Sequence, residues 1–182
     1  MIPLRHFLVL FFDEASKAYL NSISRKLYAG YCPGRPFPEI EHHLTVHYFQ
    51  CDEPHYPKII EEIELKTPRH LPVEVNIKSA YEYVNELNDF CSISLLAEKK
   101  GEVLRLHKEL TRPLEKYHLH YEPWQDWPPH ITCFPGLKLK DRPKNWHAPQ
   151  HLFSGRQPVL NGIELRLTRW SGTHIETIHR FK

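Results

Sequence analysis

The chain has 182 residues, of which 41% are hydrophobic and 25% are charged, and its formal net charge is +2. This balance excludes a disordered or collagen-like chain, and the charge is far below that of a protein that binds nucleic acid by electrostatics alone. The four cysteines show no C-x-x-C spacing, and the N-terminal apolar run is too short for a signal peptide or a membrane span. We therefore expect one cytoplasmic domain over residues 1–182, with no membrane association and no obligate protein partner.

The first part of the chain predicts a strand, a helix and a second strand. Residues 5–12, RHFLVLFF, form the apolar run of a strand buried on both faces. Asp13 is placed to cap a helix that we expect to end near Gly30. A proline-rich loop then leads into residues 42–49, HHLTVHYF, whose composition is typical of a strand. A short helix is expected over residues 58–65.

The second part of the chain predicts a similar series. Residues 71–84 alternate like one or two half-buried strands, and residues 90–98, FCSISLLAE, indicate another strand. Apolar residues at helical spacing predict a helix over residues 101–117. After a loop and the segment HITCF, further strands are expected at residues 162–170 and 174–181.

One offset relates the two parts. Adding 87 takes His43 to His130 and Thr45 to Thr132, and the same offset aligns the leading strands and the helices. Two such units would most simply pack as similar lobes about a pseudo-twofold axis, with the two H-x-T segments facing each other across a central cleft. The approximate repeat units are residues 5–50 and 90–136.

The two H-x-T segments suggest acid–base chemistry. Successive side chains of a strand point to opposite faces, so the histidine and threonine of each segment share one face. Two facing imidazoles suit displacement at phosphorus: neutral histidine takes a proton from attacking water, and protonated histidine gives one to the leaving oxygen. Since the pKa of histidine is about 6.5, both forms are accessible near neutral pH. The threonine hydroxyls can donate to the non-bridging phosphate oxygens, and no metal is needed.

The same residues are open to three other interpretations. The histidines could be satisfied structural residues, since the chain has 14 of them. His43 and His47 could bind zinc, but in a strand they are separated by roughly 13 Å of rise. A thiol enzyme would use Cys133, which should point away from His130 and toward the core.

The segments EHHLTVHYF and WPPHITCFPG resemble the paired H-x-T/S motifs of the 2H phosphoesterase superfamily, which includes bacterial 2′-5′ RNA ligase-like proteins and cyclic phosphodiesterases. The proline before the second motif and the FPEIE lead-in to the first are also typical. The resemblance extends from the first strand to about residue 136. Val46 and Cys133 stand where members often have leucine, and YFQCDEP replaces the leucine-glycine pair of the ligase-like branch.

This resemblance implies an α+β fold of two similar lobes, each with an antiparallel sheet and helices, around a central cleft. It implies metal-independent hydrolysis of 2′,3′-cyclic phosphates on nucleotides or RNA ends, without a cofactor. His43 and His130 would be the catalytic acid and base, with a preference for His130 as base, and Thr45 and Thr132 would bind the phosphate. A non-catalytic module that binds RNA ends or nucleotides and a 2′-5′ RNA ligase remain alternatives.

Further residues are candidate substrate contacts. Trp124 and Trp127, in the loop before the second motif, could stack on a base or pack as a lid. Strand alternation would place His47 on the same face as His43. Arg166 and Arg169 could meet a phosphate or be solvated surface residues.

Overall fold

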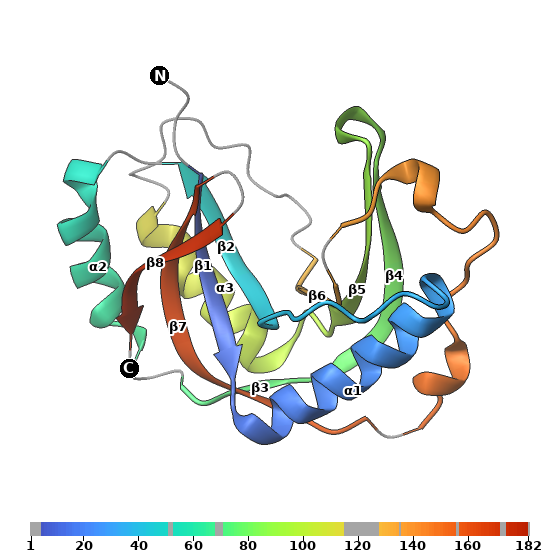
Figure 1. Cartoon of the computed structure of the whole chain (residues 1–182). Coiled ribbons are helices and arrows are strands. Elements are labelled where there is room, and N and C mark those ends of the chain that lie inside the picture. The colour runs from blue at the N-terminus through green and yellow to red at the C-terminus, as the bar shows by residue number, and fades with distance from the viewer. Residues whose placement is uncertain are drawn as a thin grey trace.

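The computed structural model describes residues 5–50, 53–67, 71–114, 128–134, 136–155, 157–171 and 174–181. Three α-helices and eight strands lie in these ranges, with short 3-10 helices between some of them (Figure 1). The helices are α1 (Glu14–Tyr31), α2 (Tyr56–Glu64) and α3 (Gly101–Leu114). The strands are β1 (Arg5–Phe12), β2 (His43–Gln50), β3 (Val73–Val75), β4 (Ile77–Asn85), β5 (Phe90–Ala97), β6 (His130–Thr132), β7 (Leu160–Ser171) and β8 (His174–Phe181).

Each element expected from the sequence has a counterpart in the structure. Asp13 caps α1 as predicted, because its Oδ1 accepts a hydrogen bond of 2.8 Å from the backbone N–H of Ser16. The helix continues one residue beyond Gly30. Residues 71–84 contribute to two strands, β3 and β4. Within the described ranges, none of the helices combines the length and the apolar character that crossing a membrane requires.

The strands of the described ranges form one curled antiparallel sheet in the order β3-β7-β1-β2-β6-β5-β4, with β8 paired to β7. The expected α+β class with antiparallel strands is confirmed. The first-lobe strands meet the second-lobe strands where β2 pairs with β6. The two sheets that the resemblance implied are thus two halves of one sheet. Whether residues 1–182 form one domain of two repeat units stays a prediction.

Each of the two longer helices contacts strands of the other half. Near the end of α1, Tyr31 donates a hydrogen bond of 2.5 Å to the Oε1 atom of Glu82 on β4, and its ring lies 5.6 Å from that of Phe134. On α3, the Nδ1 atom of His107 bonds to the carbonyl oxygen of Val46 on β2 at 2.7 Å. This exchange ties the two halves together, so the strands that carry the two H-x-T segments are held in a fixed relation.

Candidate active site

The pairing of β2 with β6 brings the two H-x-T segments side by side. One residue pair, Leu44 with Ile131, sets the antiparallel register, and both side chains are fully buried. Because side chains alternate along a strand, the residues before and after this pair point to the opposite face of the sheet. We call this opposite face the site face.

The site face carries the four predicted motif residues. Continuing the register by one residue in each direction places His43 opposite Thr132 and Thr45 opposite His130. All four are half-buried. The histidines occupy one diagonal of this group and the threonines the other, and diagonal neighbours on adjacent strands are about 7–8 Å apart. A tetrahedral phosphate placed over the group would meet an imidazole from each strand.

Both histidines are anchored in the same way. The Nδ1 atom of His43 lies 3.0 Å from the carbonyl oxygen of Glu41, and the Nδ1 atom of His130 lies 2.9 Å from that of Pro128. A carbonyl oxygen only accepts, so Nδ1 must carry the proton and donate. The proton exchange of each ring then falls to Nε2, which accepts when the ring is neutral and donates when it is charged. This is the arrangement that a general base and a general acid require.

Burial lowers the pKa of both histidines. The Pro128 carbonyl opposes this shift for His130. At His43 the carbonyl and the carboxylate of Glu41 oppose it, whereas the positive charges of His130 and Arg166 lower the pKa further. The positive charge of His130 therefore acts on His43, and both imidazoles hold their second proton less tightly than they would in water.

One arginine, Arg166, and the two glutamates that it pairs with support the His43 side of the site. Arg166 on β7 lies over the ring of Phe11 at 3.7 Å from its centroid, and Phe11 lies 5.7 Å from the ring of His43. The guanidinium forms two bonds to the carboxylate of Glu164, of 2.9 and 3.1 Å, and one of 3.1 Å to Glu41. Because it is nearly buried between two carboxylates, Arg166 is held to the protein and fixes the residue whose carbonyl anchors His43. Arg169 instead pairs with Glu176 and Glu53.

A tyrosine lies beside the other histidine. The ring of Tyr81 on β4 meets that of His130 edge to face, with centroids 6.4 Å apart. Tyr81 pairs with Ser94, which pairs with Thr132, so the three residues cross the sheet on the site face. The sequence alone did not indicate Tyr81 and Phe11, because each lies on a neighbouring strand and is aligned with the motif only by register.

A β-bulge separates His47 from the motif. Leu8 of β1 pairs with His47, but the next residue, Val9, pairs with Thr45, so Val46 is an extra residue on β2. The bulge shifts the alternation by one position, and His47 turns to the face opposite Thr45. The expectation that His47 shares the face of the motif residues is therefore wrong.

His47 is buried against α3. Its Nδ1 atom lies 3.3 Å from the Oγ1 atom of Thr111, and its ring stacks on that of Phe49 at 6.2 Å. His47 therefore does not lie on the site face and is not placed to contact the substrate. His43 and His47 lie on opposite faces of the sheet and cannot share a zinc ion. Trp124 and Trp127 lie outside the described residues.

Two further residues of the motifs point into the core. Cys133 is fully buried, as the sequence predicts, and burial raises the pKa of its thiol to about 12, which disfavours the nucleophilic thiolate. His42 is also buried, with its Nε2 atom 2.8 Å from the hydroxyl of Ser24 on α1. Burial, assisted by the charge of His43, lowers the pKa of His42 to about 4, so this ring is neutral near pH 7. In the described part of the chain, no three His, Cys, Asp or Glu side chains are grouped as metal ligands.

Solved structures of known proteins share the fold of this chain, although sequence comparisons find no match. No protein-family model matches the sequence, and no curated protein matches it. E. coli LigT complexed with 3′-AMP superimposes with a TM-score of 0.69 and 15% identity, covering 98% of this chain and 97% of that chain. TT0787 of Thermus thermophilus gives 0.62 and 20% identity, with 97% and 96% covered. Usb1 of Kluyveromyces marxianus gives 0.54 and 14%, with 96% and 97% covered.

These structures show that the chain has the fold of LigT-like 2H phosphoesterases. The resemblance inferred from the two H-x-T motifs is thereby confirmed at the level of the fold.

Proposed function

We propose that this protein is a metal-independent phosphodiesterase that hydrolyses 2′,3′-cyclic phosphates at the ends of nucleotides or RNA. The observation that carries the proposal is the matched anchoring of two imidazoles on adjacent strands, each by an Nδ1–carbonyl bond. E. coli LigT, which has this fold, has been solved with 3′-AMP and with phosphate, which supports a nucleotide phosphate as the ligand. Buried free thiols at Cys32, Cys91 and Cys133 fit the cytoplasmic location that we also propose.

In the proposed reaction, the two histidines have opposite roles on either side of the phosphorus atom. The neutral ring accepts a proton at Nε2 from a water molecule, whose oxygen forms the new bond to phosphorus. One ribose oxygen leaves, and the protonated ring supplies its proton through Nε2. The product is a phosphomonoester with a free neighbouring hydroxyl. Proton exchange with solvent restores the starting charge of both rings.

The threonines would hold the phosphate during this exchange. Thr45 and Thr132 lie on the site face beside the two imidazoles, and a hydroxyl donates to a non-bridging oxygen as negative charge accumulates there. Their diagonal placement would contact the phosphate from both strands. We propose that this contact orients the phosphorus between the two Nε2 atoms.

Hydrolysis of a 2′,3′-cyclic mononucleotide in excess EDTA tests the proposal. We expect activity to persist with the chelator, and His43→Ala or His130→Ala to lower kcat by about a hundred- to ten-thousand-fold, the usual contribution of an acid or base. His151→Ala is the matched control, since His151 is exposed and lies in the short 3-10 helix Gln150–Leu152. Full activity in either alanine variant, or loss of activity with EDTA, would contradict the mechanism.

A further inference from the structure

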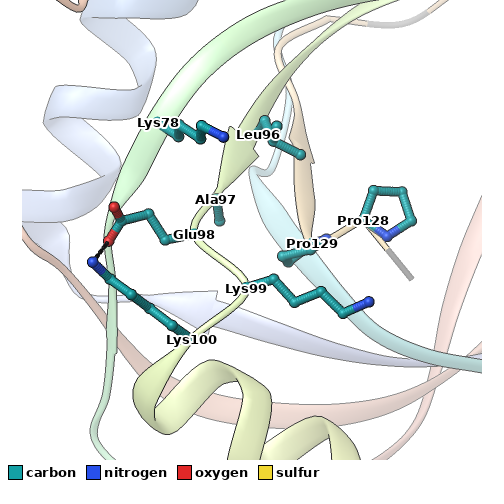
Figure 2. Close-up of a pocket in the computed structure, with 8 residues that line it drawn as sticks. All are labelled: Lys78, Leu96, Ala97, Glu98, Lys99, Lys100, Pro128 and Pro129. Carbon is teal, nitrogen blue, oxygen red and sulfur yellow. Dashed lines mark ion pairs between the residues drawn. The ribbon is translucent and has the colours of Figure 1, made fainter. Parts of the chain in front are cut away.

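A hollow of about 490 Å³ lies next to His130. Its apolar wall includes Leu96, Pro128 and Pro129 (Figure 2). These residues are also the neighbours that position the histidine: Leu96 is its partner on β5, and the carbonyl of Pro128 accepts its Nδ1 proton. The backbone N–H of Ala97 holds Pro129 by a bond of 2.8 Å to its carbonyl. The hollow therefore borders the residues that position His130 in the candidate active site.

The charged residues of this hollow are mostly lysines. Figure 2 shows Lys78 and Lys99 on different sides of it, with Lys100 nearby at an ion-pair distance of 2.8 Å from Glu98. Among the described residues that line it, three lysines against one glutamate leave a formal charge of +2. A site with this charge and an apolar wall is suited to an anion that also carries apolar surface. We call this hollow the lysine pocket.

A second hollow, beside the residues that precede His43, has the opposite charge. It measures about 450 Å³ and includes Glu39, Glu41, His42 and Lys17. Lys17 is paired with Glu14 at 2.7 Å. Two carboxylates against one ammonium leave a formal charge of −1, with His42 neutral at pH 7. Of these two hollows only the lysine pocket has a charge suited to an anion, because the other is lined by carboxylates, one of them paired with Arg166, and lies on the side of His42.

We propose that the lysine pocket binds the sugar-phosphate backbone next to the reacting cyclic phosphate, so that the preferred substrate is the end of an RNA strand. This inference rests on the proposed function and names the substrate class for it. Backbone phosphates contact the ammonium groups of Lys78, Lys99 and Lys100, and the apolar wall accepts a ribose or the face of a base. A mononucleotide has no phosphate beyond the reacting one and gains nothing from the pocket.

The test compares two substrates: an RNA oligonucleotide with a 2′,3′-cyclic phosphate end, and a 2′,3′-cyclic mononucleotide. The variant replaces Lys78, Lys99 and Lys100 by Ser. We expect the ratio of kcat/KM for RNA to kcat/KM for the mononucleotide to fall about tenfold or more. The salt dependence of the RNA reaction should also weaken, with the slope of log kcat/KM against log salt falling by about 1 to 2, because each phosphate contact contributes about 0.7.

A second triple variant controls for the loss of charge. Lys26, Lys58 and Lys140 are exposed and lie on α1, on α2 and in the turn at residues 139–141, and their replacement by Ser should leave the ratio unchanged. A ratio that is unchanged in the pocket variant, or that falls equally in the control variant, overturns the inference.

Direct binding separates this inference from the proposed function. Fluorescence anisotropy with a labelled RNA ending in a 3′-phosphate measures affinity without turnover. A protein that binds this RNA through the pocket lysines and hydrolyses neither substrate refutes the proposed function alone. A protein that hydrolyses the mononucleotide and binds the RNA equally well with and without the pocket lysines refutes the pocket alone.

Discussion

The two H-x-T segments present the same groups on different supports. Each offers an imidazole whose Nδ1 proton is bound by the carbonyl two residues earlier. In the first segment that carbonyl belongs to Glu41, whose carboxylate is held by Arg166, and the intervening residue is the buried His42. In the second, the two corresponding residues are both prolines. The anchor of His43 is held by charged side chains, and the anchor of His130 is held by the restricted backbone of two prolines.

Two segments that hold matching positions in one sheet can therefore have chemically unequal surroundings. Each proline fixes φ near −65° without any charged partner, so the anchor of His130 should be insensitive to pH. The anchor of His43 depends on an arginine and two carboxylates. Changes of pH or charge should therefore affect the His43 half first.

The largest effect is expected from His42, which has a proline as its counterpart in the other half. Its pKa of about 4 in the folded protein lies below the unfolded value of about 6.5, so the unfolded chain binds more protons between these values. Stability is therefore lost as pH falls from about 6.5 through 4, by about 3 kcal/mol. Replacing His42 by Gln, whose amide can still meet Ser24, should remove this part of the pH dependence.

Urea denaturation at pH 7 and pH 4 measures this difference as a change in the free energy of unfolding. The other buried histidines titrate in both proteins and cancel in the comparison. An identical fall in stability for wild type and His42→Gln would show that His42 is not the acid-sensitive residue of this half.

The next effect concerns the threonines, for which the comparison predicts equality. Thr45→Val and Thr132→Val each remove a hydroxyl that would donate to a charged phosphate oxygen, a bond worth about 1.5–3 kcal/mol. Each variant should therefore lose roughly 10- to 100-fold in kcat/KM for a cyclic mononucleotide, and the two losses should be similar. Thermal unfolding checks that both variants fold. A loss confined to one variant would mean that the phosphate is held from one strand only.

The sequence predicts the faces of the motif strands well where alternation is regular, and poorly where it is not. The alternation of Leu44 with its neighbours places His43 and Thr45 correctly on the site face. The bulge at Val46 leaves no mark in a run of strand-forming residues, because any of them fits either register. His47 was misplaced for that reason.

The surroundings of the site are harder to predict than the motifs. Arg166 is 125 residues from Glu41, and Tyr81 is 49 residues from His130. The strand order β7-β1-β2 and β6-β5-β4 brings them next to the histidines, and this order depends on which edges pair in three dimensions. The local pattern around Arg166 and Tyr81 is that of an ordinary strand. The two motifs were recognisable because their spacing repeats.

The smallest effect is the sharpest test of the difference between the halves. Replacing Arg166 by Met removes a positive charge that lowers the pKa of His43 and removes the cation that Glu41 pairs with, so that pKa should rise. The Glu41 carbonyl remains, so we expect the maximum of kcat/KM to fall only roughly tenfold. Tyr81→Phe, which keeps a ring beside His130, is the control for the other half.

The pH profile of kcat/KM reports the free enzyme, and for wild type both limbs should reflect pKa values below about 6.5, with the optimum on the acidic side. A base must be neutral, so its pKa sets the rising limb, and an acid must be protonated, so its pKa sets the falling limb. In Arg166→Met only the limb of His43 should move to higher pH. Movement of the falling limb identifies His43 as the acid, and movement of the rising limb identifies it as the base. If both limbs move together, the charge cluster acts on the whole site, and the proposed inequality of the two halves is wrong.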